Sequence, residues 1–325
     1  MTESGWLTGA VALILISAAL VALTVALSRR AAARVPPLGR FVDLPAARLH
    51  MVDRGDPGDS GALPLILIHG LGGQLRHFSY RLIDELVRTH RVIAYDRPGS
   101  GYSTWKPGRA GTLSEQVDLV GALATSLGLG KFILVGHSLG GAIAIGAAIA
   151  HRERVAGLAL LAPLTRLPGA APVRGADWLR RVDWVWRVIA WSWAVPVASL
   201  RRPQWLRSIF MPDPVPGDFA IRGGGDLVLR PEPVLGAARD ALDIPRWLTT
   251  LTSHYPTLHD CGTLPIGVLY GRQDRVLSAS EQGERFASDI AHVALRQIDG
   301  GHMLPVTQPE ACAQLIRWVA DAARR

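Results

Sequence analysis

The fold is decided by the stretch Lys131-Phe132-Ile133-Leu134-Val135-Gly136-His137-Ser138-Leu139-Gly140-Gly141. Its four apolar residues, 132–135, predict a buried strand, and the small residues of 142–150 predict a helix. Between them stands G-x-S-x-G, which places Ser138 on a sharp turn whose neighbours must lack side chains. The N–H of Leu139 would then face any oxyanion that forms beside the Ser138 hydroxyl. The same motif also fits an ordinary Gly-Ser turn, so the surrounding sequence has to distinguish a turn that carries a nucleophile from an ordinary one.

Further apolar runs on both sides of this stretch predict a mostly parallel sheet. The expected strands are 65–68, 92–95, 155–161, 265–270 and 293–298, preceded by a hairpin over 41–53. Helical patterns at 112–127 and 308–323 lie between or after these runs. Strands that alternate with helices in this way indicate an α/β fold whose sheet is covered on both faces.

The regular alternation breaks between Leu164 and Thr250. Seven of the ten tryptophans fall here: Trp178, Trp184, Trp186, Trp191, Trp193, Trp205 and Trp247. We expect an inserted, largely helical cap over the carboxyl edge of the sheet. The predicted organisation is therefore an N-terminal segment over 1–34, the first part of the core over 35–163, the cap over 164–250 and the second part of the core over 251–325.

The N-terminal segment contains 22 residues without a charge, from Trp6 to Leu27. This length suffices for a helix to cross a hydrocarbon core of about 30 Å. A cleaved signal peptide is the alternative, but it needs a basic flank before a shorter apolar run, and Met1 to Gly5 has no basic side chain. We expect an uncleaved transmembrane helix. Arginines 29, 30, 34 and 40 follow it, so the positive-inside rule predicts a cytoplasmic domain.

Composition narrows the classes of partner. Lys and Arg number 35 against 27 Asp and Glu, which gives a net charge of +8. No Arg/Lys-dense block with interleaved aromatic residues occurs in the parts of the sequence that carry the candidate catalytic residues, so nucleic acid is not expected, and an anionic membrane surface fits the charge better. The two cysteines, Cys261 and Cys312, have no metal-site spacing and indicate no disulfide framework. No metal and no cofactor are expected.

Four motifs in chain order resemble the α/β-hydrolase superfamily, over roughly residues 41–323 without the cap. They are His69-Gly70 after one strand, Asp96-Arg97-Pro98-Gly99-Ser100-Gly101 after the next, the Gly136–Gly140 turn, and Asp274 and His302 after the last two strands. The order nucleophile, acid, base matches the family. The resemblance implies an α/β-hydrolase fold with a helical cap.

The resemblance also implies a role for each of these residues. Ser138 would be the nucleophile, His302 the general base and Asp274 the residue that orients His302. The N–H groups of Leu71 and Leu139 would form the oxyanion hole.

Other polar residues near these motifs have structural interpretations. His69 is expected to hold the loop of residues 69–73, which carries the Leu71 N–H and is called the oxyanion loop below. Asp96 and Arg97 are expected to stabilise their own turn. His137 is expected to shape the substrate pocket or to contact backbone. Trp191 and Trp193 are candidates for substrate binding, with a core role or membrane contact as alternatives.

A serine at the turn implies an acyl-enzyme. Haloalkane dehalogenases and soluble epoxide hydrolases of similar layout use aspartate there, and are therefore disfavoured. The expected function is a membrane-anchored hydrolase of a small lipophilic carboxylic ester, with the bilayer as a partner. Acyl transfer to another alcohol, perhydrolysis and carbon–carbon bond hydrolysis use the same three residues and stay open, as do a non-catalytic binding role and the oligomeric state.

Overall fold

A nine-stranded sheet forms the centre of the domain in the computed structural model, which describes the chain except for residues 1–2, 57, 59–60, 168–182, 260–263 and 291. Its order is β1-β2-β4-β3-β6-β7-β8-β9, with β5 beside β2. The strands are β1 (Arg40–Asp43), β2 (Ala47–Arg54), β3 (Leu65–Ile68), β4 (Val92–Tyr95), β5 (Thr104–Trp105), β6 (Phe132–His137), β7 (Val155–Leu161), β8 (Ile266–Gly271) and β9 (Val293–Ile298). Pairs from β4 to β9 are parallel and pairs that include β2 are antiparallel. The predicted mostly parallel sheet is confirmed.

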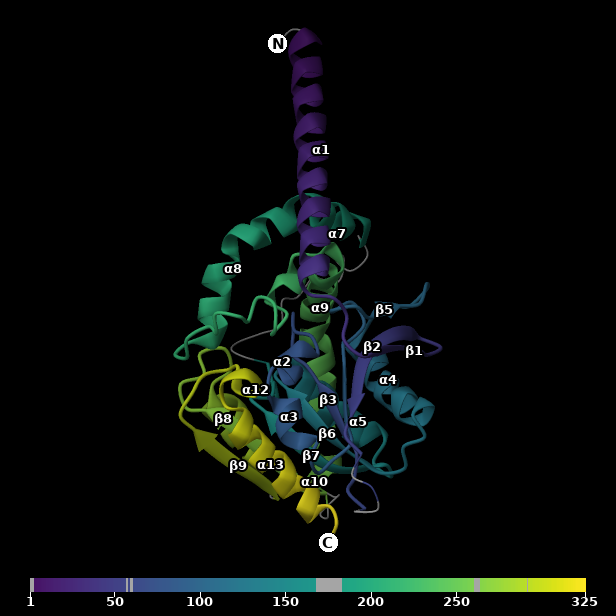
Figure 1. Ribbon diagram of the computed structural model, residues 1–325, viewed down its shortest axis with the longest axis vertical. Coiled ribbons are helices and arrows are strands. Elements are labelled where there is room, and N and C mark those ends of the chain that lie inside the picture. Colours follow the sequence, from purple (N-terminus) through teal and green to yellow (C-terminus); the bar gives the residue numbers. More distant parts are fainter. Residues whose placement is uncertain (1–2, 57, 59–60, 168–182, 260–263, 291) are drawn as a thin grey trace.

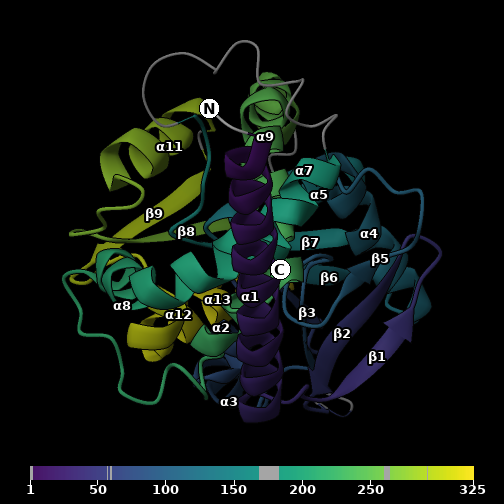
Figure 2. The ribbon, with the colours of Figure 1, turned by 90° about the horizontal axis from the view of Figure 1, so that it is seen from above.

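Helices cover both faces of the sheet (Figure 2). One face carries α2 (Arg76–Ser79), α3 (Leu82–Leu86), α12 (Leu304–Thr307) and α13 (Pro309–Ala322). The other carries α4 (Leu113–Ser126), α5 (Leu139–Ala150), α10 (Tyr255–His259), η4 (Ala279–Glu284) and α11 (Arg285–Asp289). Because both faces are covered, strands β3, β4 and β6 are buried along their whole length. A capping box between Thr112 and Glu115 fixes where α4 begins.

The cap is largely helical, as predicted. Its described elements are α7 (Asp183–Ile189), η2 (Ala190–Ala194), α8 (Val195–Phe210), η3 (Gly225–Val228) and α9 (Pro231–Ser253). Trp178 lies outside the described residues. Helix α9 continues past Thr250, and its Leu248 and Leu251 belong to the main hydrophobic core. The last helix of the cap is therefore also a helix of the core.

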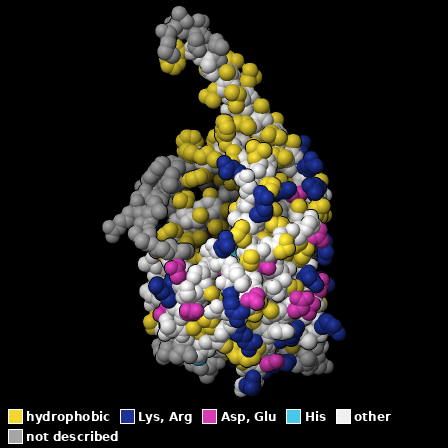
Figure 3. Space-filling view, turned by 90° about the vertical axis from the view of Figure 1, so that its left-hand side faces the viewer, with side chains coloured by type: hydrophobic (Ala, Val, Ile, Leu, Met, Phe, Trp, Pro, Cys, Tyr) yellow, Lys and Arg dark blue, Asp and Glu magenta, His cyan; other side chains and the backbone are white. Residues whose placement is uncertain are grey.

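Helix α1 (Glu3–Arg34) projects from the end of the domain at which α7 and α8 lie (Figure 1). Its residues 9–34 are long and apolar enough to span a membrane, and most of this stretch is exposed. Hydrophobic side chains cover its described length and continue onto the adjoining end of the domain (Figure 3). The last turns are different, because Thr24 and Ala31 are buried against the cap. Helix α1 is thus free at one end and packed at the other.

Candidate active site

Ser138 occupies a strained turn between β6 and α5. Its backbone has φ 54° and ψ −123°, a region that residues with a side chain rarely adopt. The turn is tight because a Cβ on Gly136 would lie 2.5 Å from the Gly140 oxygen, and one on Gly140 would lie 2.0 Å from the Ile68 oxygen. The three backbone segments can approach this closely only without those side chains. The hydroxyl of Ser138 has no hydrogen-bond partner among the described residues, and its side chain is half-buried.

Asp274 and His302 meet above the carboxyl ends of β8 and β9. The Nδ1 atom of His302 lies 2.7 Å from Asp274 Oδ2, and both side chains are buried. The other carboxylate oxygen accepts the N–H groups of Val276 and Leu277, at 2.8 and 2.9 Å. Both oxygens of this carboxylate therefore have hydrogen-bond partners, which fixes the plane of the carboxylate. The carboxylate in turn fixes the ring of His302.

His137 joins the turn to the histidine loop. Its Nε2–H donates to the backbone oxygen of His302 at 3.0 Å, and the two rings lie 5.0 Å apart. Burial, together with the nearby imidazole of His302, holds the pKa of His137 well below its usual range. A neutral His137 thus tethers the backbone that carries His302 next to Ser138. This is the backbone contact expected for His137; whether it also lines a substrate pocket stays a prediction.

The predicted oxyanion donors flank Ser138. Leu139 is the first residue of α5, so its N–H lacks an intrahelical partner. The N–H of Leu71 also has no partner among the described residues, and its loop passes close to the nucleophile, because a Cβ on Gly70 would lie 2.8 Å from Ser138 Cβ. Together the two groups can present paired N–H donors beside the serine hydroxyl.

Two of the cavities beside the cap bear on the choice of a substrate pocket. An apolar one of about 320 Å³ opens beside the oxyanion loop, and its lining includes Gly72, Ala198, Trp205, Val228 and Val234. Such a volume is typical of a small-molecule pocket. It lies beside α1, because Ala198, Val228 and Val234 also pack on the cluster that contains Ala31.

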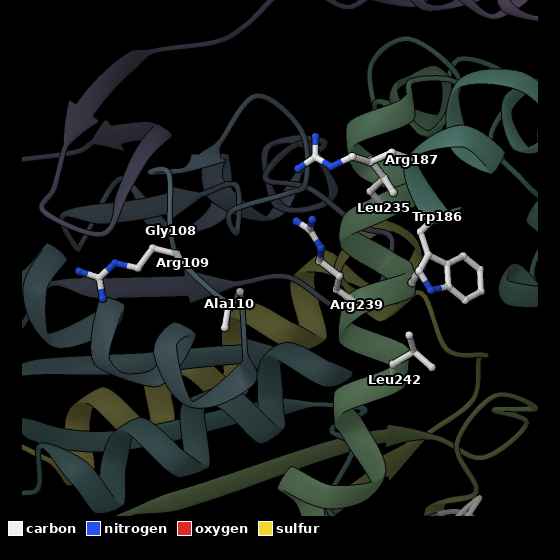
Figure 4. A pocket seen from close by; sticks show the side chains of 10 residues that line it. Gly108, Arg109, Ala110, Trp186, Arg187, Leu235, Arg239 and Leu242 are labelled. Atoms are coloured by element: carbon white, nitrogen blue, oxygen red, sulfur yellow. The ribbon is translucent and has the colours of Figure 1, made fainter. Parts of the chain in front are cut away.

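The second cavity, of about 450 Å³, lies between residues 108–111 and helices α7 and α9 (Figure 4). Arg187 and Arg239 extend toward it, and no predicted triad residue lines it. No predicted triad residue lines the apolar cavity either, but Gly72, next to Leu71, does, so the apolar cavity is the better candidate for an alkyl chain.

Trp191 and Trp193 lie on η2, beside α1, and line neither cavity. Both are exposed, at 39% and 54%. Trp205, by contrast, lines the apolar cavity and reaches the oxyanion loop: a Cβ on Gly72 would lie 3.9 Å from its ring. Nothing in the sequence of α8 distinguishes Trp205 from the other tryptophans of the cap as a residue that lines a cavity. Substrate binding by Trp191 and Trp193 stays a prediction.

The motif Asp96-Arg97 has a wider role than its own turn. Asp96 is buried and accepts the N–H groups of Leu75 and Tyr102 at 2.8 Å, and lies 2.7 Å from His50 Nδ1. Arg97 reaches across to the oxyanion loop and to Asp240 of the cap. No cluster of His, Cys, Asp and Glu suited to a metal ion occurs in the part of the chain that the structure describes.

Comparisons with known proteins agree with this architecture. A family model described as the alpha/beta hydrolase family matches residues 65–315. The acetyltransferase component of the acetoin cleaving system of Pseudomonas putida is 41% identical over 88 residues, which are 27% of this chain and 23% of that protein. The 2-hydroxymuconate semialdehyde hydrolase of Pseudomonas sp. (strain CF600) is 35% identical over 112 residues, 34% of this chain and 38% of that protein. The chain thus aligns with less than half the length of either protein.

A solved structure resembles the whole chain. A membrane phospholipase A superposes with a TM-score of 0.67 and 22% identity, over 99% of this chain and 100% of that one. At this identity the likeness shows a shared fold.

Proposed function

The chain belongs to the alpha/beta hydrolase family, and from this premise we propose that it is a membrane-anchored serine hydrolase that cleaves a lipophilic carboxylic ester. The observation that carries the proposal is the His302–Asp274 pair, whose loop is tethered through His137 to the strained turn of Ser138. The residues that we propose as nucleophile, base and orienting acid come from three separate loops at one edge of the sheet.

The proposed reaction forms and then breaks an acyl-enzyme. Ser138 Oγ attacks the ester carbonyl while His302 Nε2 takes the hydroxyl proton. The carbonyl oxygen becomes an oxyanion that the N–H groups of Leu71 and Leu139 stabilise. Collapse breaks the carbon–oxygen bond, and His302 gives its proton to the departing alcohol. Water, deprotonated by His302, then attacks the acyl-enzyme in the same way and releases the carboxylic acid. Throughout, Asp274 holds the imidazole and stabilises its protonated form.

The substrate class follows from the surroundings of the serine. The cavity beside Gly72 is apolar, and an alkyl chain placed there would gain roughly 0.8 kcal/mol per buried CH₂. The apolar helix α1 packs beside that cavity, so a bilayer would lie on the same side of the molecule. The membrane phospholipase A of similar fold is, by its description, a lipolytic enzyme of a membrane. These features favour a lipid-like ester over a soluble one, and we include the bilayer among the partners.

The test is a set of nucleophile and base variants of the detergent-solubilised full-length chain. Ser138→Ala should lower kcat on a p-nitrophenyl ester by about 10⁴-fold or more and abolish labelling by a fluorophosphonate. His302→Ala should lower kcat by a similar factor, and the double variant little more, because the two groups act as one unit. Additive losses, or labelling that survives Ser138→Ala, would refute the mechanism. Persistent absence of labelling in the unmodified protein would favour a binding role instead.

A further inference from the structure

The carbonyl of Gly70 is held by three hydrogen bonds. It accepts from Arg97 Nη2 at 2.9 Å, from His69 Nδ1 at 2.8 Å and from the N–H of Gly73 at 3.2 Å. A peptide unit is planar and trans, so its C=O and N–H point in opposite directions. The carbonyl of Gly70 and the N–H of Leu71 belong to one such unit. Whatever fixes the Gly70 oxygen therefore also aims the Leu71 N–H, the proposed oxyanion donor.

Arg97 is the centre of this arrangement. It is 1% exposed, and its backbone N–H donates to His69 Nε2 at 2.9 Å while its Nε donates to the His69 oxygen at 3.0 Å. Burial, aided by the charge of Arg97, holds the pKa of His69 well below its usual range. His69 therefore stays neutral, with Nδ1 as the donor to Gly70 and Nε2 as the acceptor from Arg97. Arg97 and His69 together define one orientation of the loop.

The cap supplies the counter-charge of Arg97. Nη1 donates to Asp240 Oδ2 of α9 and to Gln116 Oε1 of α4, each at 2.7 Å. Gln116 Nε2 also donates to Asp240 Oδ1 at 2.8 Å, and both acceptor side chains are buried. A buried guanidinium depends on such partners, because an unpaired charge is strongly disfavoured there. The seating of α9 against the core thus determines whether Arg97 is held in place.

We infer that Arg97 and Asp240 are positioning residues for the oxyanion hole, through which the cap sets the direction of the Leu71 N–H. The inference rests on the proposed function, since it assumes that Leu71 stabilises an oxyanion. Both side chains are buried in this network, so we assign neither of them a contact with the substrate. A disturbed orientation weakens binding of the transition state and leaves binding of the ground state unchanged, so kcat falls at constant KM.

The chain offers a matched control for Asp240. Asp243, three residues later on α9, is buried as well, and its Oδ2 accepts the N–H of Leu113 at the start of α4 at 2.7 Å. Its bond to Leu113 links the cap to the core as the bonds of Asp240 do, but it runs through the backbone of α4 instead of Arg97. Asp240→Asn and Asp243→Asn are the paired variants, assayed in the detergent-solubilised full-length chain. Loss of a whole oxyanion donor costs about 10²–10³-fold in kcat, so partial misorientation should cost about 10-fold.

Three readouts separate positioning from packing. Asp240→Asn should lower kcat about 10-fold on p-nitrophenyl butyrate with KM unchanged, and should weaken inhibition by butylboronic acid by a similar factor. That boronic acid adds to the serine oxygen as a tetrahedral anion and so reports on the oxyanion hole. Asp243→Asn should leave kcat and the inhibition by butylboronic acid within twofold of the values for the unmodified chain. This should hold even where thermal unfolding shows that Asp243→Asn destabilises the protein as much as Asp240→Asn does.

Equal effects of the two variants, or a change in KM alone, would overturn the inference. If Asp240→Asn does not fold, Gln116→Leu, which removes one acceptor from Arg97 and keeps the ion pair, is expected to show the same pattern more weakly, and an unchanged kcat there overturns it too. Failure of the proposed function itself looks different, because Ser138→Ala would then stay active or labelled whatever Asp240 does.

Discussion

His77 lies beneath the oxyanion loop and carries a pH dependence of folding. It is buried against Phe219 and Gly73, and burial lowers its pKa to about 4 from 6.5. Between these values the unfolded chain binds a proton that the folded chain does not bind, so the free energy of unfolding falls as the pH falls. Burial lowers the pKa of His69 and His137 in the same direction.

We therefore predict that the free energy of unfolding is constant above about pH 6.5 and falls steadily toward pH 4. His77→Gln should remove up to ~3 kcal/mol of this pH dependence, at about 1.4 kcal/mol per pKa unit. The measurement is chemical unfolding at a series of pH values. His254→Gln serves as the control because His254 is exposed. Equal pH profiles for both variants would contradict the prediction.

At the residue scale, the sequence predicts those parts of the candidate site that depend on residues close to one another in the chain. The glycines around Ser138 are visible in the sequence because the turn itself needs them, and Asp274 and His302 each lie within four residues of the end of a strand. Arg97 and Asp240 are 143 residues apart, and nothing near either of them signals the other. A buried ion pair between core and cap depends on tertiary packing, so the sequence alone suggested only a turn for Arg97.

The last turns of α1 form a joint with the cap. Arg34 pairs with buried Asp226 at 2.9 Å, and Arg202 of α8 pairs with the same carboxylate. Ala31 packs with Val195 and Leu229 in a small cluster of its own. The sequence predicted an apolar span over 6–27, whereas the helix extends from Glu3 to Arg34, because hydropathy could not show that it continues into the domain. The residues just after α1 are also held in place, since Val35 is buried and the Pro36 oxygen accepts from Arg76.

Two truncations should therefore behave differently. Removal of residues 1–20 leaves the joint complete, so the domain should stay folded and hydrolyse a short ester at nearly the full rate. Removal of residues 1–34 uncovers Val195 and Leu229 and takes one partner from Asp226, which should cost ~3 kcal/mol of stability. Thermal unfolding and ester turnover of the two proteins decide the matter. Equal stability of both would mean that the joint contributes nothing.

The apolar cavity between α8 and α9 should set the chain length of the substrate. Ala198→Trp fills part of it, so kcat/KM on an octanoyl ester should fall at least 10-fold relative to an acetyl ester, the loss expected for about two buried CH₂ groups. Val197→Trp is the control, because Val197 neighbours Ala198 on α8 but is 49% exposed. A uniform loss on both esters would assign this cavity to folding or catalysis instead of chain selection.

At the scale of the whole molecule, the face shown in Figure 3 has its apolar surface gathered on α1 and on the adjoining end of the domain. Lys and Arg side chains accompany the apolar surface near the helix, whereas most acidic side chains of that face lie farther away (Figure 3). The exposed Trp191 and Trp193 lie on η2, beside α1. Such a face suits an anionic bilayer, whose headgroups attract basic residues and whose interface accommodates tryptophan.

The full-length chain should accordingly sediment with membranes and resist extraction by alkaline carbonate. The arginines after Leu27 predict a cytoplasmic domain, so a C-terminal tag should be protected from protease in intact cells. The protein without residues 1–20 is the control and should be soluble. Recovery of the full-length chain in the soluble fraction would refute the anchor, and cleavage of the tag would reverse the orientation.

The joint between α1 and the cap has a kinetic consequence once α1 spans a bilayer. A domain on a loose tether samples many heights above the lipid, whereas a domain fixed to its helix keeps the mouth of the cavity at one height. Encounter with substrate then takes place in two dimensions. The rate depends on the mole fraction of substrate in the surrounding lipid, so inert lipid in the same vesicle slows turnover by dilution, while additional vesicles in the tube have no effect.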